Sequence, residues 1–375
     1  MRVLLLHNRY RAQGGEERTV ADLFELLRAR GHEVRLLERS SAQASRVRAA
    51  RALLRGGEEP DEVARAVRDV RAEVVHAHNL HPLFGWRALA AARAAGARTV
   101  LQLHNFRLFC AIAVAFRDGA PCYRCHHTHT SPGLRLRCRG SLPEAAVYAA
   151  GLRTQQPRLF EHADRFAVLS EAHGARLEQL GLPSERAHLL PNFIPRARIS
   201  RRSRAQEQTY ALVAGRLVEE KGFDTAISAA RTAGVPLVVA GEGPDLPRLR
   251  ELAGGADVRF TGWLDGERLA ALRTGAALVL VPSRCEEACP YAVLDALSDG
   301  VPVLVSDRGG LPEMAPADAV LPAEDVGAWS EALAALWGDP TARHERGEAA
   351  LARAREQFGE DTHHERLMEL YAATT

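Results

Sequence analysis

The first informative absence in this 375-residue chain is that of a long hydrophobic run. No stretch reaches the roughly 18 apolar residues that a membrane-spanning helix needs. The apolar run at the start ends at His7-Asn8-Arg9, and no small-residue cleavage site follows it. A buried first strand is therefore predicted there and not a signal peptide, and we expect a cytoplasmic protein.

The chain also has little net charge. It contains 49 Lys and Arg against 47 Asp and Glu, which leaves a formal charge of +2. Proteins that bind nucleic acid usually carry a larger and more clustered basic excess, so no nucleic-acid partner is expected. A hydrophobic content of 46% and this length predict two domains, each with its own core.

Cysteines are few, and most of them are clustered. In a cytoplasmic chain the six cysteines are expected to be thiols or metal ligands and not disulfides. Four lie within 29 residues: Cys110, Cys122, Cys125 and Cys138. Cys122 and Cys125 have the spacing of a zinc knuckle, and three histidines follow directly as spare ligands. This segment predicts a structural zinc site; reduced thiols without metal are the alternative.

Short apolar runs alternate with amphipathic stretches along both halves of the chain. This alternation is typical of parallel strands that are covered by helices on both faces. The predicted strands are Val3–His7, Glu33–Leu37, Val74–Ala77, Thr99–Leu103, Arg165–Leu169, Tyr210–Ala214, Pro236–Ala240, Val258–Phe260, Ala277–Val281, Val301–Ser306 and Ala319–Leu321. The main predicted helices are Glu17–Arg30, Phe84–Ala95, Leu142–Ala163, Pro290–Asp299 and Thr362–Ala373.

These elements predict two Rossmann-like, doubly wound parallel-sheet domains with a cleft between them. Residues 1–195 form the first domain, with a Cys-rich insertion at 106–140. The polar, basic residues 196–208 have the composition of a linker and hinge. Residues 209–358 form the second domain, and 359–375 a helix that packs back on the first. In such sheets ligands bind beyond the carboxyl ends of the strands.

Basic residues follow the first strand of the second half. Arg216 and Lys221 lie in the loop after Tyr210–Ala214, between Gly215 and Gly222. Arg can bind two oxygens of a phosphate at once, and Lys adds a point charge. The glycines would let the backbone approach a ligand closely. A solvated basic loop is the alternative.

Further glycines follow the later strands of this half. They are Gly241 and Gly243 before a proline, Gly262, and the pair Gly309-Gly310. Turns of this kind leave free N–H groups at the start of a helix, where they can meet a phosphate.

Two carboxylates eight residues apart complete the pattern. Glu287 precedes the helix Pro290–Asp299, and Asp295 lies within it in an apolar setting. A buried carboxylate needs hydrogen-bond partners, and sugar or ribose hydroxyls are suitable ones. Glu286 is an alternative first acid, and an ordinary helix carboxylate is the alternative for Asp295.

Together these motifs resemble retaining glycosyltransferases of the GT-B fold, most closely family 4 (glycosyl transferases group 1). That family has a G-R-L-x-x-x-K-G loop, a G-x-G-P turn, F-x-G, P-S, two Glu eight residues apart and G-G-x-x-E. The chain matches each point except that Asp295 stands where the family has Glu. The resemblance implies that Arg216 and Lys221 hold the donor diphosphate, Glu287 the sugar and Asp295 the ribose. It also implies retained anomeric configuration and no cofactor for catalysis.

The resemblance extends more loosely into the first half. Gln13-Gly14-Gly15 opens the first helix without the Gly-x-Gly-x-x-Gly fingerprint of dinucleotide binding. In the family this loop touches the donor phosphate and the acceptor, which implies that role for Gly15. His104 ends the fourth strand, where the family has a His near the transferred sugar, and Asn105 replaces the Asp that commonly follows it.

The expected function is transfer of a sugar from a UDP- or GDP-sugar to an acceptor. The acceptor could be a cell-surface glycan, a lipid-linked sugar or a natural product, and peripheral contact with a membrane is left open. Two alternatives also stay open. One is a nucleotide-sugar epimerase of the same fold, and the other is a non-catalytic nucleotide-sugar-binding protein.

Overall fold

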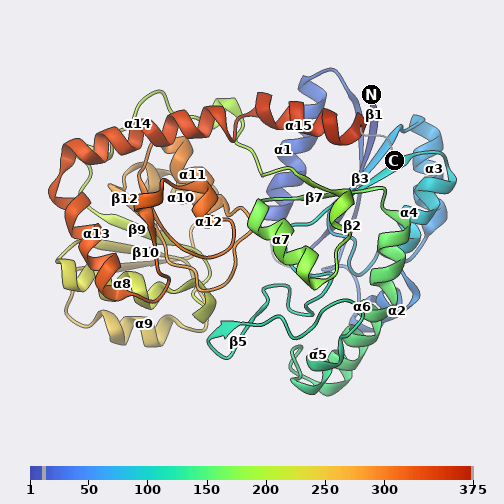
Figure 1. Ribbon diagram of the computed structural model, residues 1–375, viewed down its shortest axis with the longest axis horizontal. Coiled ribbons are helices and arrows are strands. Elements are labelled where there is room, and N and C mark those ends of the chain that lie inside the picture. The colour runs from blue at the N-terminus through green and yellow to red at the C-terminus, as the bar shows by residue number, and fades with distance from the viewer. Residues whose placement is uncertain (11–13, 373–375) are drawn as a thin grey trace. The chain divides into compact units, whose positions relative to one another are not determined.

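The computed structural model describes residues 1–10 and 14–372 (Figure 1). Gln13 and the predicted helix end Ala373 lie outside the described residues. The chain divides into two compact units. Unit 1 holds Met1–Ala115, Cys122–Pro191 and the chain from His364 onward, and unit 2 holds Phe116–Pro121 and Asn192–His363.

Unit 1 is built on a parallel sheet of six strands, ordered β2-β1-β3-β4-β7-β8. Its strands are β1 (Arg2–Arg9), β2 (Glu33–Ser40), β3 (Val74–Ala77), β4 (Arg98–Gln102), β7 (Arg165–Val168) and β8 (Ala187–Leu189). Alternate residues of β1 enter different cores: Leu4 and Leu6 join one cluster, Val3 and Leu5 the other. Both faces of the strand are therefore buried, which explains its continuous apolar run.

Helices cover both faces of this sheet (Figure 1). The Leu4 and Leu6 cluster includes side chains of α3 (Pro60–Val70), α4 (Gly85–Ala94), α6 (Leu142–His162) and α7 (Glu171–Leu180). α2 (Arg46–Arg55) and α5 (Ser131–Arg135) pack on α6. On the other face lie α1 (Gly15–Ala29) and the later turns of α15 (Glu360–Ala372). The Tyr371 hydroxyl lies 2.7 Å from Nδ1 of His76 there.

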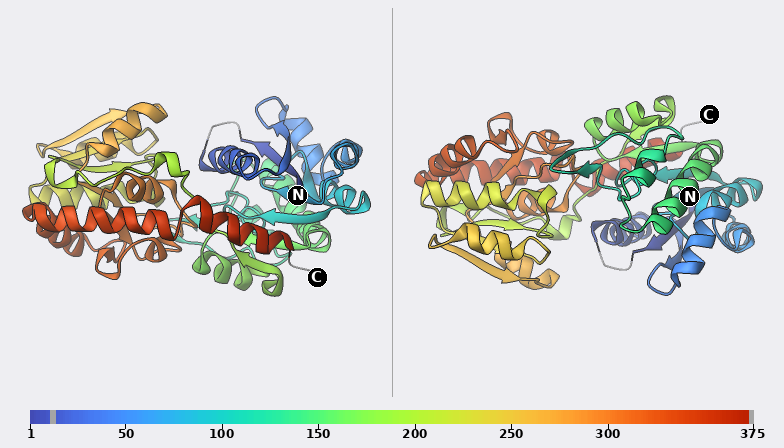
Figure 2. Two further views of the ribbon diagram at one scale, coloured as in Figure 1. Left: turned by 90° about the horizontal axis from the view of Figure 1, so that it is seen from above. Right: turned by 90° about the horizontal axis from the view of Figure 1, so that it is seen from below.

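Unit 2 repeats this architecture with the strand order β11-β10-β9-β12-β13-β14. Its strands are β9 (Ala211–Ala214), β10 (Leu237–Ala240), β11 (Val258–Gly262), β12 (Leu278–Val281), β13 (Val303–Ser306) and β14 (Val320–Leu321). Two groups of helices pack among themselves (Figure 2). One group is α8 (Phe223–Ala233), α9 (Leu246–Ala253) and α13 (Val326–Gly338); the other is α10 (Gly266–Thr274), α11 (Tyr291–Asp299) and α14 (Pro340–Glu356). The short α12 (Leu311–Met314) follows β13.

The predicted fold class is confirmed, because both units are doubly wound parallel sheets. Each predicted strand is present, with ends that differ by at most a few residues. The sequence did not predict β8, nor the hairpin of β5 (Phe116–Arg117) and β6 (Ala120–Pro121) inside the Cys-rich insertion. These strands have only two or three residues each, too few for a periodic pattern.

The structure differs from the prediction that residues 196–208 are a linker between the domains. This segment belongs to unit 2, and the chain passes from unit 1 to unit 2 at Pro191–Asn192. It contains 3-10 turns at Arg196–Arg198 and Ala205–Glu207. Ser203 is 1% exposed, its hydroxyl donates to the Gly300 carbonyl over 2.6 Å, and its N–H donates to Glu348 over 2.6 Å. These contacts of Ser203 anchor the segment within unit 2, and the hinge predicted there stays a prediction.

None of the helices in the described parts of the chain is long and apolar enough to cross a membrane.

Candidate active site

Lys221 and Glu287 come together at the carboxyl ends of the strands of unit 2. Lys221 ends a 3-10 turn, Glu219–Lys221, after β9, and Glu287 lies between β12 and α11. Nζ of Lys221 donates a hydrogen bond to Oε1 of Glu287 within an ion pair. The Ser283 hydroxyl donates to the same oxygen over 2.8 Å. Two residues that the sequence predicted for the donor site therefore form one contact.

Both members of this pair are charged near neutral pH. Burial opposes ionisation of Glu287, but the charge and hydrogen bond of Lys221 hold the pKa of this carboxyl below its usual value. Burial also opposes the charge of Lys221, and Glu287 holds the pKa of this amine above its usual value. The pair thus places a fixed dipole at the edge of the sheet.

Arg216 lies beside this pair and faces solvent. Its side chain is 66% exposed, and its guanidinium reaches Glu220 only at 3.8 Å. Its positive charge works against the raised pKa of Lys221 and adds to the lowered pKa of Glu287. An exposed arginine beside a half-buried lysine leaves the fork of the guanidinium available to an anionic group.

The glycines of these loops have a role that the sequence did not reveal. Gly222 has φ 65°, and a Cβ there would lie 2.0 Å from the Pro282 carbonyl oxygen. Gly309 has φ 57°, and its Cβ would lie 2.5 Å from the Glu287 carbonyl oxygen. The Gly310 N–H donates to that same oxygen over 2.7 Å. These glycines therefore let the loops approach one another. The predicted approach of the backbone to a ligand stays a prediction.

Four further predicted donor glycines also lie in unit 2 at or just beyond strand ends: Gly215, Gly241, Gly243 and Gly262. A Cβ on Gly241 would lie 1.8 Å from the Gly215 carbonyl oxygen, so the loops after β9 and β10 are in contact as well.

Asp295 has a partner inside the protein. Nη1 of Arg273, on α10, donates to Asp295 over 3.4 Å, and the same guanidinium binds Asp299 over 2.6 Å. An arginine from a neighbouring helix therefore supplies a partner of the kind for which the sequence analysis suggested sugar or ribose hydroxyls. The ribose role of Asp295 stays a prediction from the resemblance alone.

Unit 1 has a pocket at the carboxyl ends of β1, β3 and β4. Its lining includes Tyr10, Glu16, His81, Gln102 and His104. Glu16 lies in the first turn of α1, directly after Gly15. The pocket therefore contains one predicted residue, His104, and adjoins another, Gly15. Both belong to unit 1, whereas the other predicted donor residues belong to unit 2.

His104 is uncharged at neutral pH. Burial lowers the pKa of this imidazole to about 3, and neighbouring histidines add to the effect. Its Nε2 lies 3.0 Å from Nδ1 of His78, and the two rings stack. A neutral imidazole can both donate and accept, as a sugar hydroxyl requires.

Glu16 is the residue of this pocket that sequence reasoning missed. It is 8% exposed, and burial raises the pKa of its carboxyl to about 8, against hydrogen bonds from the Tyr10 hydroxyl and the Asn79 N–H. The sequence signal was an acid directly after a glycine pair, but acids are also common at the start of any helix.

The pocket carries unused hydrogen-bonding capacity. Within the described parts of the chain, Nε2 of His81 and both amide atoms of Gln102 have no hydrogen-bond partner. His81 is 8% exposed and Gln102 is 2% exposed. Buried polar groups usually have partners in proteins, so unpaired donors and acceptors around a pocket indicate a place for water or ligand hydroxyls.

The clustered cysteines lie in unit 1, and none of these four described residues forms a disulfide. Burial raises the pKa of the Cys125 thiol to about 11, and Cys110, Cys138 and Cys122 add to the effect, so the four lie in one region. No three His, Cys, Asp or Glu side chains within residues 1–10 and 14–372 are placed to hold a metal ion. The predicted zinc site therefore has no preformed geometry, and it stays a prediction.

Comparisons with known proteins agree with these features. The model for "Glycosyltransferase Family 4" matches residues 13–198, and that for "Glycosyl transferases group 1" matches residues 196–353. A GDP-mannose-dependent alpha-(1-6)-phosphatidylinositol monomannoside mannosyltransferase of Mycobacterium tuberculosis is 34% identical over 154 residues, 37% of this chain and 40% of that protein. A putative colanic acid biosynthesis glycosyltransferase of Salmonella typhimurium is 26% identical over 223 residues, 54% of each chain.

Solved structures share the fold over nearly the whole chain. Sucrose-phosphate synthase from Thermosynechococcus elongatus has a TM-score of 0.71 at 17% identity, covering 99% of this chain and 98% of that one. Anabaena HepE in complex with UDP has a TM-score of 0.67 at 16% identity, covering 98% and 99%. By contrast, the chain spans between a fifth and about half of the length of the curated relatives it matches. The two family models together span residues 13–353, and the chain belongs to the family 4 type of glycosyltransferases with the GT-B fold.

Proposed function

We propose that the chain transfers a sugar from a nucleoside diphosphate donor and that unit 2 binds this donor. The observation that carries the proposal is the exposed Arg216 beside the Lys221–Glu287 ion pair at the strand ends. An arginine fork and a half-buried ammonium are groups that suit a diphosphate. They also stabilise the charge that develops as the nucleoside diphosphate leaves, without a metal ion.

Glu287 is proposed to bind hydroxyls of the donor sugar. Within the described residues, Lys221 and Ser283 both donate to its Oε1, which leaves Oε2 to accept from a ligand. Lys221 thereby has two functions: it offsets the charge of the diphosphate and keeps the carboxylate ionised and oriented. Asp295 is proposed, by resemblance, to bind the ribose.

The pocket of unit 1 is proposed to bind the hydroxyls of a sugar. Its lining mixes donors and acceptors, with neutral His104, neutral His81 and the amide of Gln102. Hydroxyls donate and accept at once, whereas a phosphate only accepts and would leave the Gln102 carbonyl oxygen unpaired. The anomeric configuration is proposed to be retained, as in the family.

GDP-mannose is the first donor to test, because curated relatives carry that donor in their names. UDP-sugars come second, because two structural neighbours hold UDP. The experiment incubates the protein with each nucleotide sugar without acceptor and measures release of GDP or UDP. Slow hydrolysis of one donor is expected. Absence of both binding and hydrolysis across the panel would contradict the proposal.

A further inference from the structure

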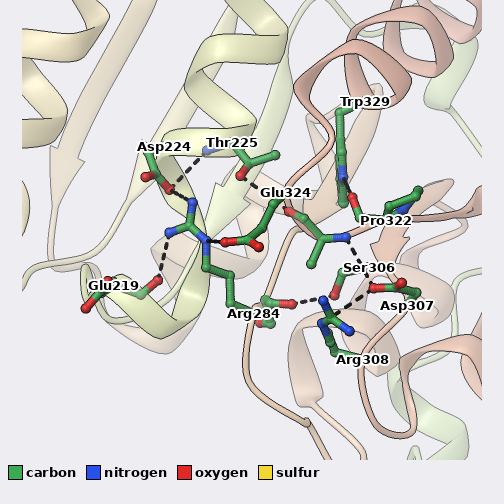
Figure 3. A network of polar contacts seen from close by, with 12 residues as sticks. Glu219, Asp224, Thr225, Arg284, Ser306, Asp307, Arg308, Pro322, Glu324 and Trp329 are labelled. Carbon is green, nitrogen blue, oxygen red and sulfur yellow. Dashed lines mark hydrogen bonds and ion pairs between the residues drawn. The ribbon is translucent and has the colours of Figure 1, made fainter. Parts of the chain in front are cut away.

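Arg284 connects the two loops that carry Lys221 and Glu287 (Figure 3). It follows Ser283 in the loop after β12, three residues before Glu287. Its side chain is only 15% exposed, and its guanidinium reaches Asp224 at the start of α8. A largely buried guanidinium is stable only where several acceptors surround it.

The first set of acceptors is the backbone of the Lys221 loop. Nη1 of Arg284 donates to the Glu219 carbonyl over 3.2 Å, and its backbone N–H donates to the Glu220 carbonyl over 2.8 Å. The Cys285 N–H donates to the same Glu220 oxygen over 3.2 Å. The residues that accept are the two that directly precede Lys221, so three hydrogen bonds fix this loop against the Glu287 loop.

Two carboxylates complete the surroundings of Arg284. Nη2 lies 3.0 Å from Oδ1 of Asp224, in the first turn of α8, and Nε lies 3.2 Å from Oε1 of Glu324. Burial opposes ionisation of Asp224, but Arg284, together with Arg248, holds the pKa of this carboxyl below its usual value. One guanidinium therefore spans the Lys221 loop, α8 and the segment after β14.

The ion pair at the site depends on this spacing. Lys221 and Glu287 come from loops 66 residues apart in sequence, and their contact is a direct hydrogen bond. A displacement of about 1 Å between the loops would break a contact of this kind. The backbone carbonyls of Glu219 and Glu220 accept hydrogen bonds from Arg284 and Cys285, and these bonds hold the Lys221 loop beside the Glu287 loop.

We propose that Arg284 is a positioning residue that holds Lys221 and Glu287 at the spacing needed for the donor diphosphate. Its side chain acts through the Glu219 carbonyl and through Asp224 and Glu324, and it does not contact the donor. The backbone N–H bonds to the Glu220 carbonyl remain when this side chain is replaced. The proposal rests on the donor site assigned to unit 2. A lysine cannot replace this arginine, because its single nitrogen cannot reach three acceptors that lie beside three separate nitrogens of the guanidinium.

The test compares Arg284→Ala and Arg284→Lys with Arg248→Ala as a matched control. Arg248 also binds Asp224, over 3.1 Å, and binds Asp245 over 2.7 Å, but these bonds go to side chains. Affinity for GDP and for UDP is measured by calorimetry on the full chain, with folding checked by circular dichroism. We expect about tenfold weaker nucleotide binding for both Arg284 variants, on the scale of one lost charged hydrogen bond, and less than twofold change for Arg248→Ala.

A second readout does not depend on nucleotide binding. Hydrogen exchange of peptides covering residues 217–222 and 283–288 reports the mobility of both loops. Exchange should rise severalfold in Arg284→Lys and stay unchanged in Arg248→Ala. Nucleotide affinity or loop exchange in Arg284→Lys that matched the parent protein would overturn the proposal. A parent protein that binds no nucleotide would instead refute the proposed function, and the exchange experiment would still decide the role of Arg284.

Discussion

The two units share one architecture but place very different chemistry at the carboxyl ends of their strands. In unit 2 this edge is charged: Lys221, Glu287, Arg284 and Asp224 all take part in ion pairs. In unit 1 the histidines of the corresponding edge are neutral, because burial lowers the pKa of His7 to about 4 and of His81 and His104 to about 3, and Arg107 is a cation in the pocket lining. Burial keeps a histidine neutral, whereas a buried carboxylate or ammonium stays charged only beside an opposite charge.

The difference supports the proposal that each unit binds a different part of a substrate. A charged edge suits the diphosphate of a nucleotide sugar, and a neutral edge with mixed donors and acceptors suits hydroxyls. If this comparison is correct, substitutions in unit 2 should mainly change chemistry at the phosphate. Substitutions in unit 1 should mainly change the response to pH and to sugar structure.

Lys221→Ala should have the largest effect. The lysine balances charge that develops as the diphosphate leaves, so its removal should lower kcat by roughly 10²-fold or more. It also leaves Glu287 buried without its counter-charge, so the melting temperature should fall. Steady-state kinetics with one working donor measure the first effect. A folded variant with near-normal kcat/KM would place the site elsewhere.

Glu287→Gln should have a smaller effect of about tenfold on kcat/KM, because the amide keeps the shape but loses the charged acceptor. Discrimination between donor sugars should fall as well, since the contact proposed is with sugar hydroxyls. Kinetics with two epimeric donors test this. An unchanged ratio of kcat/KM between the two epimers would show that Glu287 does not bind the sugar.

Glu16→Gln tests the neutral edge of unit 1. Its pKa, raised to about 8, means that the folded state binds an extra proton between the unfolded value near 4.5 and pH 8. Stability of the parent protein therefore falls across this window as pH rises, and the variant lacks this loss. The melting temperature of the variant relative to the parent should increase from pH 5 to pH 8 by about 2 °C or more. A constant difference would show that Glu16 is ionised in the folded protein.

Metal content tests the cysteine segment, where the smallest effect on catalysis is expected. Freshly prepared, chelator-free protein should contain about one zinc per chain, held by Cys110, Cys122, Cys125 and Cys138. Removing the metal should lower the melting temperature and leave nucleotide affinity unchanged, because the site is structural and lies in unit 1. Elemental analysis without zinc would leave these residues as reduced thiols.

The sequence predicted those features that depend on local patterns. Val74–Ala77 was predicted and is found with the same ends, because a short apolar run between helices specifies a buried strand almost by itself. Lys221 and Glu287 were predicted as site residues because they occur in a known order of motifs. Each motif follows a strand, and the strands concerned, β9 and β12, are neighbours in the sheet. Features that depend on distant contacts were not predictable. Ser203 reads as part of a linker until Gly300 and Glu348 are seen to bind it.

Contacts between residues distant in sequence also explain the other differences between the predictions and the structure. Asp295 reads as an unpaired acid because Arg273 is 22 residues away in sequence. The pocket around Glu16 and Gln102 combines residues that carry no recognisable motif, and only their shared burial identifies it. Arg284 is one of many arginines in the sequence, and its three-way contact appears only when the loops are placed in space.

Calorimetric titration of GDP and UDP into the full chain, with and without EDTA, tests the central claim most directly. The claim is that protein cations of unit 2, Arg216 and Lys221, bind the diphosphate. At least one nucleotide should bind, its affinity should be the same in EDTA, and Arg216→Ala should weaken it about tenfold. Binding that requires Mg²⁺, or that is unchanged in Arg216→Ala and Lys221→Ala, would contradict the account.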